Sequence, residues 1–362
     1  MKNPSVTTNG LFSYSTLVRG TSWFILCTAL GIGIALWWKM PDHVKVLDYD
    51  LNWSFVLLLL PAVVIDYVLG GIRFRLLFDG TVLPFVSLWD CMRSNWANCF
   101  MGAVTPFRTG GGPAQIYILW RCGVKISQSM LVSVITFMAT LFFFLIASIT
   151  VLYVLPADLF SGPLERLIRI GFILFGGVLM MLLLCFFFPV AMQRWVNRIV
   201  ELLPPSFREA KGLPGRFVTI LHGGLVRFAS DTERIRREKK GSMVAIFIVT
   251  PVLFFNKFLM GYIIARVFLP VVPLGSIIGL QILIYFLNYF APTPGASGIE
   301  EIASVWLLGH IIPHDILILF AILLRFVTVI LAAGFGGIVM FLDFRKNVLK
   351  HHGGRADGKT QT

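Results

Sequence analysis

The stretch Ala291-Pro292-Thr293-Pro294-Gly295-Ala296-Ser297-Gly298-Ile299-Glu300-Glu301 interrupts an apolar tract and ends in two acidic residues. Proline and glycine break helices, and backbone groups without hydrogen bonds are not tolerated against lipid. A break at membrane depth must therefore be buried in protein or line a polar cavity. Ionisable groups at that depth are costly and usually functional.

The composition places this stretch in a membrane protein. Hydrophobic residues make up 57% of the 362 residues, charged residues make up 14%, and the mean hydropathy is +0.83. Such a chain has more apolar surface than one soluble core can bury. We expect an all-α polytopic membrane protein with about six full spans, because six runs are long enough to cross a bilayer. These runs are 21–38, 53–72, 128–155, 168–189, 243–269 and 316–342.

The formal net charge of +13 does not indicate nucleic-acid binding, because the charges are concentrated beside apolar runs. Residues 191–241 contain eleven basic and five acidic residues. Basic segments remain in the cytoplasm, so we expect a basic amphipathic linker at 191–241 and a disordered basic tail at 345–362, both inside. Segments 194–203 and 216–238 suit helices that lie on an anionic membrane surface.

The order of the crossings predicts two re-entrant helical hairpins. The polar segment 1–20 is placed in the cytoplasm, and the first transmembrane half, 21–190, contains a broken tract that starts and ends inside. In the second half, 242–344, the broken tract starts and ends outside. We therefore expect hairpins near 85–120 and 275–311. Their opposite entry is typical of two inverted-topology halves, with cytoplasmic N- and C-termini. The alternative is that both breaks are surface loops.

The break in the first half is Thr105-Pro106-Phe107-Arg108-Thr109-Gly110-Gly111, which resembles the Thr-Pro and small residues of 293–298. Asn98 and Asn288 precede the two breaks. Glycine amides and the Arg108 guanidinium are groups that can bind an anion together. A flexible loop without a ligand is the alternative for the three-glycine run.

A buried ion pair is predicted near the middle of the membrane. Glu301 and Arg325 each lie about 15 Å from the outer surface when the helix rise is counted. A carboxylate and a guanidinium at one depth stabilise each other, since either one alone is poorly solvated. Glu300 is the competing partner for Arg325.

Enzyme signatures are absent from the sequence. It has no Gly-x-x-x-x-Gly-Lys-Ser/Thr loop, no His-Glu-x-x-His motif and no Gly-x-Ser-x-Gly elbow. His310 and His314 flank Pro313, which breaks the helix between them, so with Asp315 they are interpreted as an interfacial loop. We therefore expect neither a metal nor a cofactor.

Residues 292–301 resemble the Pro-Gly-Gly-x-Gly-x-x-Glu signature of the lysylphosphatidylglycerol synthase transmembrane-region family, also called flippase-like membrane proteins. Arg73-Phe74-Arg75-Leu76-Leu77, the Thr105 break, Gly123 and Arg325 are similar too, and the resemblance extends from about Thr21 to Phe344. The family's glutamate matches Glu301. Its second glycine is Ala296 here, which we expect to narrow the turn. The resemblance implies the lipid-translocating part without the soluble aminoacyl-transferase domain.

We therefore expect a flippase-like lipid transporter of a bacterial cytoplasmic membrane that moves a phospholipid or a lipid-linked anionic headgroup. Arg108 and Arg325 would meet the phosphate, while Glu301 would hold Arg325 or exchange a proton. The candidate substrate-binding residues are Arg108, Thr105, Gly110, Gly111, Pro294, Gly295, Ser297, Gly298, Glu301 and Arg325. The supporting residues are Glu300, Asn98, Asn288, Arg73 and Asp66.

Membrane phospholipids are the expected partners, further copies of the chain are an open alternative, and nucleic acid is not expected. Two other classes of function also stay open. One is a membrane-embedded enzyme acting on a lipid-linked substrate. The other is a non-transporting lipid-binding subunit, for which small residues such as Ala332 and Gly336 allow close contact between helices.

Overall fold

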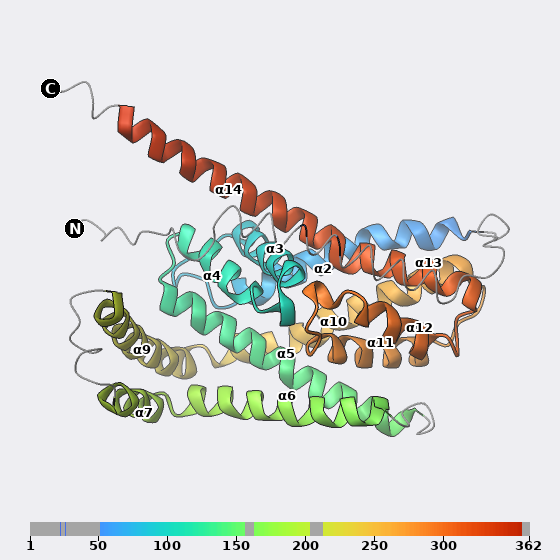
Figure 1. Ribbon diagram of the computed structural model, residues 1–362, viewed down its shortest axis with the longest axis horizontal. Coiled ribbons are helices and arrows are strands. Elements are labelled where there is room, and N and C mark those ends of the chain that lie inside the picture. Colours follow the sequence, from blue (N-terminus) through green and yellow to red (C-terminus); the bar gives the residue numbers. More distant parts are fainter. Residues whose placement is uncertain (1–21, 23–25, 27–50, 156–162, 203–212, 357–362) are drawn as a thin grey trace. The chain divides into compact units, whose positions relative to one another are not determined.

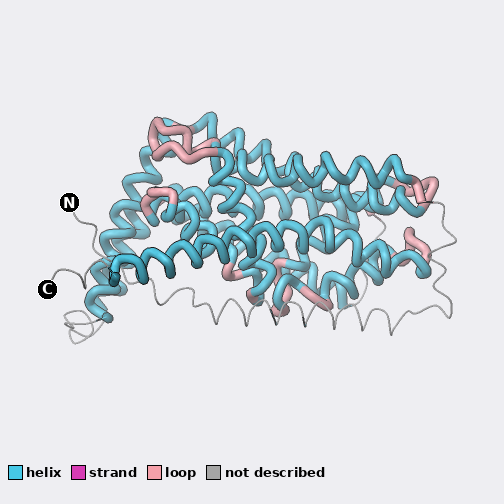
Figure 2. The backbone as a smooth tube through the Cα atoms, turned by 90° about the horizontal axis from the view of Figure 1, so that it is seen from above, coloured by secondary structure: helices cyan, strands magenta, loops and turns pink. Residues whose placement is uncertain are grey.

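The computed structural model describes residues 51–155, 163–202 and 213–356, together with Ser22 and Leu26. Every regular element in these ranges is a helix, and no strand occurs among them (Figure 2). The elements are α2 (Trp53–Arg75), α3 (Leu88–Val104), η2 (Pro106–Arg108), α4 (Gly111–Arg121), α5 (Ile126–Val154), α6 (Pro163–Phe187), α7 (Pro189–Leu202), α9 (Leu213–Glu238), α10 (Lys240–Phe268), α11 (Leu274–Asn288), η4 (Pro294–Ala296), α12 (Ile299–Leu308), α13 (His314–Arg325), η5 (Phe326–Ile330) and α14 (Leu331–Ala356).

Within the described part of the chain, five helical stretches are long and apolar enough to cross a membrane. They are Trp53–Arg75, Ile126–Val154, Glu165–Phe187, Lys240–Phe268 and Asp315–Asp343. The shortest has 23 residues, which is about 35 Å of helix and exceeds a hydrocarbon core of about 30 Å. These stretches confirm five of the six predicted apolar runs as helices. The sixth, 21–38, lies outside the described residues apart from Ser22 and Leu26.

The chain divides into two compact units, each assembled from separate pieces of sequence. Unit 1 contains residues 1–59, 96–111 and 260–362, and unit 2 contains 60–95 and 112–259. The short helices α3 and α4 flank the first proline-containing break, and α11 and α12 flank the second. The breaks themselves both belong to unit 1.

Unit 2 is centred on α5, which packs against α6 and α9 (Figure 1). The apolar centre is a cluster of phenylalanine rings from α5 and α10. Phe254 lies against Phe143, with ring centroids 5.3 Å apart, and against Phe144, with centroids 4.7 Å apart. Such pairs add about 0.5–1.5 kcal/mol beyond the burial of their area. The cluster therefore ties α5 to α10 within this unit.

An ion pair outside the apolar helices connects two loops of unit 2. Lys239, between α9 and α10, donates a hydrogen bond to Asp79 in the loop after α2. Burial raises the pKa of the Asp79 carboxyl, but hydrogen bonds from Lys239 and Thr81 outweigh it and lower this pKa to about 2. The basic linker predicted at 191–241 thus contributes a contact that positions the start of α10.

In unit 1, α14 packs closely against the second half of α3. A Cβ atom at Gly336 would lie 2.0 Å from the carbonyl oxygen of Trp96, so only glycine fits there. The neighbouring Phe335 ring stacks on the Trp96 ring with centroids 5.4 Å apart. The predicted close contact at the small-residue face of Ala332 and Gly336 is therefore made at Gly336.

The C-terminal helix is longer than the sequence predicts. Disorder is expected for 345–362, but α14 continues to Ala356, and residues 357–362 lie outside the described part. Nucleation is the costly step in helix formation, and the packed part of α14 has already supplied it. Lys, Leu, Arg and Ala residues in the following turns then favour continuation of the helix.

Candidate functional site

The first break is a tight turn held by one threonine. Thr105 Oγ1 donates a hydrogen bond to the Met101 carbonyl at 2.6 Å and accepts one from the Gly110 amide at 2.8 Å. It thereby joins the end of α3 to the start of α4. Phe107 and Arg108 both have left-handed backbone, with φ of 52° and 56°. Non-glycine residues rarely adopt this conformation, and such strain is concentrated at functional sites.

The second break repeats this backbone. Thr293 is extended, with φ −89° and ψ 148°, as Thr105 is, with φ −118° and ψ 144°. The residue after each proline is left-handed, with φ 52° at Phe107 and 59° at Gly295. The next residue is left-handed too, with φ 59° at Ala296. The short Thr-Pro echo in the sequence therefore corresponds to one turn conformation used twice.

The alanine at position 296 stands on strained backbone, while the expected narrowing of the turn stays a prediction. Its buried side chain stands on left-handed backbone, a conformation that costs a non-glycine residue about 1–2 kcal/mol. Gly298, two residues later, is also left-handed, with φ 84°. A glycine would adopt this backbone without the steric cost that the alanine side chain adds.

The two breaks contact each other inside unit 1. The Phe107 amide donates a hydrogen bond to the Ala291 carbonyl at 3.2 Å. The Arg108 guanidinium lies over the Tyr289 ring, 5.8 Å from its centroid. Phe107 itself is 53% exposed, and Arg108 is partly exposed. The first break therefore presents an aromatic ring and a cation at its contact with the second.

The glycines of the first break are needed for packing. A Cβ atom at Gly110 would lie 2.7 Å from Thr105 Cγ2, and one at Gly111 would lie 2.9 Å from Asn98 Oδ1. The Gly110 amide is already bonded to Thr105. The predicted glycine nest for an anion therefore lacks this amide, and the Arg108 side chain stays a candidate anion-binding group of the turn.

Arg325 holds the second break together. Its side chain is 2% exposed, and its Nη2 donates hydrogen bonds to the Gly295 carbonyl at 3.1 Å and to Ser297 Oγ at 2.5 Å. Its Nη1 lies 3.9 Å from Glu300 Oε2. The described ion pair thus uses Glu300, the competing partner in the sequence prediction. Glu301 follows in α12, but its side chain is not among the described ones.

A wide helical turn follows Arg325 directly. Residues Phe326–Ile330 form a π-helical segment between α13 and α14. Segments of this kind are rare and frequently mark functional sites. Arg325 is the last residue before it, so the segment directly follows the residue that bonds to the second break.

The supporting residues divide between the two units. Asn98 lies beside Gly111, and Asn288 ends α11 with its side chain 2% exposed. Asp66 and Arg73 belong to unit 2. Arg73 donates hydrogen bonds to the Thr136 carbonyl at 2.6 Å and to Thr140 Oγ1 at 2.8 Å.

Two side chains that make contacts with predicted site residues are absent from the predicted set. Tyr289 supplies the ring beneath Arg108, and its position next to Asn288 at a helix end was the available signal. Lys257 pairs with Asp66 across 2.9 Å, and its position inside an apolar run was the signal there.

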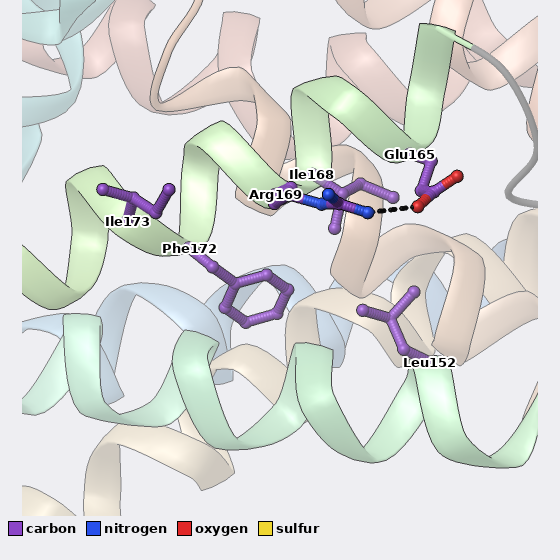
Figure 3. A pocket seen from close by; sticks show the side chains of 6 residues that line it. All are labelled: Leu152, Glu165, Ile168, Arg169, Phe172 and Ile173. Carbon is purple, nitrogen blue, oxygen red and sulfur yellow. Dashed lines mark hydrogen bonds and ion pairs between the residues drawn. The ribbon is translucent and has the colours of Figure 1, made fainter.

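A cavity of about 300 Å³ between α5 and α6 contains none of the predicted site residues. Leu152, Ile168, Phe172 and Ile173 line it together with an ion pair of Glu165 and Arg169, which are 2.6 Å apart (Figure 3). Both charged side chains are well exposed. The breaks in unit 1 remain the candidate site.

Apolar helices of spanning length and two proline-broken turns that touch define a multi-pass membrane protein with a helix-break site. The chain belongs to the family described as the lysylphosphatidylglycerol synthase TM region, which it matches over residues 16–336. It is also similar to a UPF0104 membrane protein of Archaeoglobus fulgidus. The two are 23% identical over 313 residues, which cover 81% of this chain and 90% of that protein.

Proposed function

We propose that this protein is a flippase-like transporter that moves a phospholipid or a lipid-linked anionic headgroup across the cytoplasmic membrane. The observation that carries the proposal is the contact between two turns of matching conformation, one of which presents Arg108 over Tyr289. Paired helix breaks in two halves of a membrane protein are typical of transport sites.

The lengths of the helices beside the breaks support re-entrant hairpins in two inverted halves. The helices α3 and α4 are about 25 Å and about 16 Å long, and α11 and α12 are about 22 Å and about 15 Å long. None reaches the thickness of about 30 Å that a full crossing needs. The Ser94 hydroxyl donates to the Gln115 carbonyl, so α3 and α4 return side by side, and α11 packs against α12. Both breaks then lie within the membrane.

Arg108 and Arg325 have different roles in this proposal. Among the described residues, the Arg108 guanidinium makes no hydrogen bond or ion pair, and its recorded contact is the Tyr289 ring. Its donors are therefore available for the forked recognition of a phosphate. Arg325 is almost fully buried and bonded to the second break. Arg108 is the phosphate-binding residue, and Arg325 positions the turn that faces it.

Translocation and stability of Arg108 variants test the proposal. Purified protein is reconstituted in vesicles with headgroup-labelled phospholipid, and label movement and thermal unfolding are measured on the same samples. Arg108→Lys keeps the charge but loses the fork, so translocation should fall by about tenfold, which corresponds to about 1.4 kcal/mol. Unfolding should be unchanged. Arg169→Lys, at an exposed pair, is the matched control and should behave as wild type.

The alternatives predict other outcomes. If Arg108 has only a structural role, Arg108→Lys should lower stability and translocation together. Lipid binding without translocation in the wild type would favour the non-transporting subunit. Chemical conversion of the labelled lipid would favour the membrane-embedded enzyme.

A further inference from the structure

A buried ion pair belongs to unit 2, whereas both breaks belong to unit 1. Asp66 Oδ2 in α2 accepts a hydrogen bond from Lys257 Nζ in α10 at 2.9 Å, and the side chains are 8% and 15% exposed. Asp66 lies about 20 Å along α2 from Trp53 and about 14 Å from Arg75, which is deep within a helix of spanning length. Ionisable pairs at such depth are expensive and mark ion or substrate pathways.

The pair is incompletely satisfied. Within the described residues, Asp66 Oδ1 is buried and makes no hydrogen bond. A buried carboxylate normally has partners for both oxygens, because an unpaired polar atom in a low dielectric costs free energy. A structural ion pair would gain from a second donor at this oxygen. An oxygen with an unused lone pair is instead suited to receive a proton.

Each of the two helices that carry the pair contains a proline. Pro61 stands inside α2, and Pro251 stands inside α10. A proline inside a helix removes a backbone hydrogen bond and bends the helix, which gives a place for local opening. The Asn256 side chain bridges the two helices by donating to the Ala62 carbonyl at 2.9 Å. The prolines give each helix a place where local movement can bring water to the pair.

We propose that Asp66 and Lys257 form a proton-coupled binding site for an anionic phosphodiester, a proposal that rests on the transport function above. A proton from water binds the Asp66 carboxylate and changes its charge from −1 to 0. The Lys257 ammonium keeps its charge of +1 and is released from its counter-ion. The phosphodiester anion then takes the place of Asp66. One proton and one anion enter together, so the net charge of the site is the same before and after.

The surroundings of Asp66 determine what else can titrate. Among the described contacts of α10 with this part of α2, Lys257 is charged and Asn256 is neutral. On α2 the neighbours are the Tyr67 phenol and, about two turns further, Arg73. From α5 the groups that meet Arg73 are Thr136 and Thr140, which do not titrate. Among these described groups, Asp66 is the carboxylate that directly contacts Lys257.

Linkage gives a measurable consequence. If proton and anion bind together, each raises the affinity for the other by the same factor. With one proton taken up per anion, the affinity changes by at most about tenfold for each pH unit. Dihexanoyl phosphatidylmethanol is a suitable probe, because its phosphodiester stays singly charged between about pH 5 and 8. Dimethyl phosphate presents the same group without the lipid.

The experiment measures binding of both probes to the full chain in detergent from about pH 5 to 8, together with proton uptake reported by a pH dye. The wild type should bind the lipid more tightly as pH falls and take up about one proton per lipid. Asp66→Asn mimics the protonated acid, so it should bind at every pH as the wild type binds at low pH, without proton uptake. Lys257→Met should lose the pH-dependent binding. Asp90→Asn, at the surface pair with Arg93, should behave as wild type.

The outcomes separate this proposal from the transport function. Lipid binding that does not change with pH in the wild type overturns the coupling but leaves transport standing. Absence of lipid binding at any pH overturns both. If Asp66→Asn fails to fold, the double variant Asp66→Asn with Lys257→Met removes both charges. It should fold and lose the binding at this pair, so any lipid that still binds elsewhere on the protein should bind independently of pH. Persistent pH dependence in that variant contradicts the proposal. Tighter binding of the lipid than of dimethyl phosphate assigns the anion to a lipid, and equal affinity assigns it to a soluble phosphodiester.

Discussion

Removal of the Arg325–Glu300 pair should destabilise unit 1 in a non-additive way. The atoms are 3.9 Å apart, and the side chains are 2% and 7% exposed. At an effective dielectric constant of about 20, two unit charges at this distance attract each other by about 4 kcal/mol. Loss of one partner leaves the other charge buried and typically costs about 3–5 kcal/mol. Arg325→Met also removes the bonds to Gly295 and Ser297, so it should be the more damaging single change.

The assay is a double-mutant cycle of Arg325→Met and Glu300→Gln, with unfolding followed in mixed detergent micelles. The double variant should be less destabilised than the sum of the single variants by about 1–3 kcal/mol. The exposed pair Glu165–Arg169 gives the matched control, with a coupling of about 0.3–0.5 kcal/mol. Additive losses within about 0.5 kcal/mol would refute the reasoning. A parallel cycle with Glu301→Gln shows whether the neighbouring carboxylate also contributes.

Three further changes have directions that follow from the structure. Ala296→Gly should stabilise the protein by about 1 kcal/mol in thermal unfolding, because glycine removes left-handed strain; a loss of stability would contradict this. Gly336→Ala should lower the free energy of unfolding by at least about 1–3 kcal/mol, because the added Cβ meets the Trp96 carbonyl. Gly334→Ala is the control, since a Cβ there enters open space and should be neutral or stabilising. Equal effects of the two changes would refute the close contact. The pKa of Asp79 is lowered from 3.8 to about 2, so its stabilising contribution is complete above about pH 4 and is lost as pH falls through about 2. Asp79→Asn should abolish that part of the acid dependence, and an unchanged melting curve between these pH values would contradict the pairing.

The apolar helices were predictable because the bilayer restricts them strongly. A spanning segment must satisfy its backbone internally and present apolar side chains to lipid, so length and composition identify it. The predicted runs 53–72 and 128–155 show this. The corresponding helices α2 and α5 begin and end within a few residues of the predicted positions. The short helices beside the breaks were also predictable, because Pro106 and Pro294 cannot continue a helix.

The details of the site required the structure. Glu300 and Glu301 lie at nearly the same depth, and about 100° of helix rotation separates them, so counting residues along the helix cannot choose between them. The left-handed backbone of Phe107 could not be predicted, because glycine is the residue that usually signals this conformation and position 107 is a phenylalanine. Asp66 and Lys257 are 191 positions apart, and no local pattern reports such a pairing. These features depend on tertiary packing, which a single sequence does not display.

The most direct test of the central claim is the movement of labelled phospholipid between the two leaflets of vesicles that contain the wild-type protein. The label starts in one leaflet, and its appearance in the other is followed with and without an imposed proton gradient. The transport function predicts faster movement than in protein-free vesicles, and Arg108→Lys should slow it at unchanged stability. Movement at the protein-free rate for folded wild-type protein, under every gradient and from either leaflet, would contradict the claim.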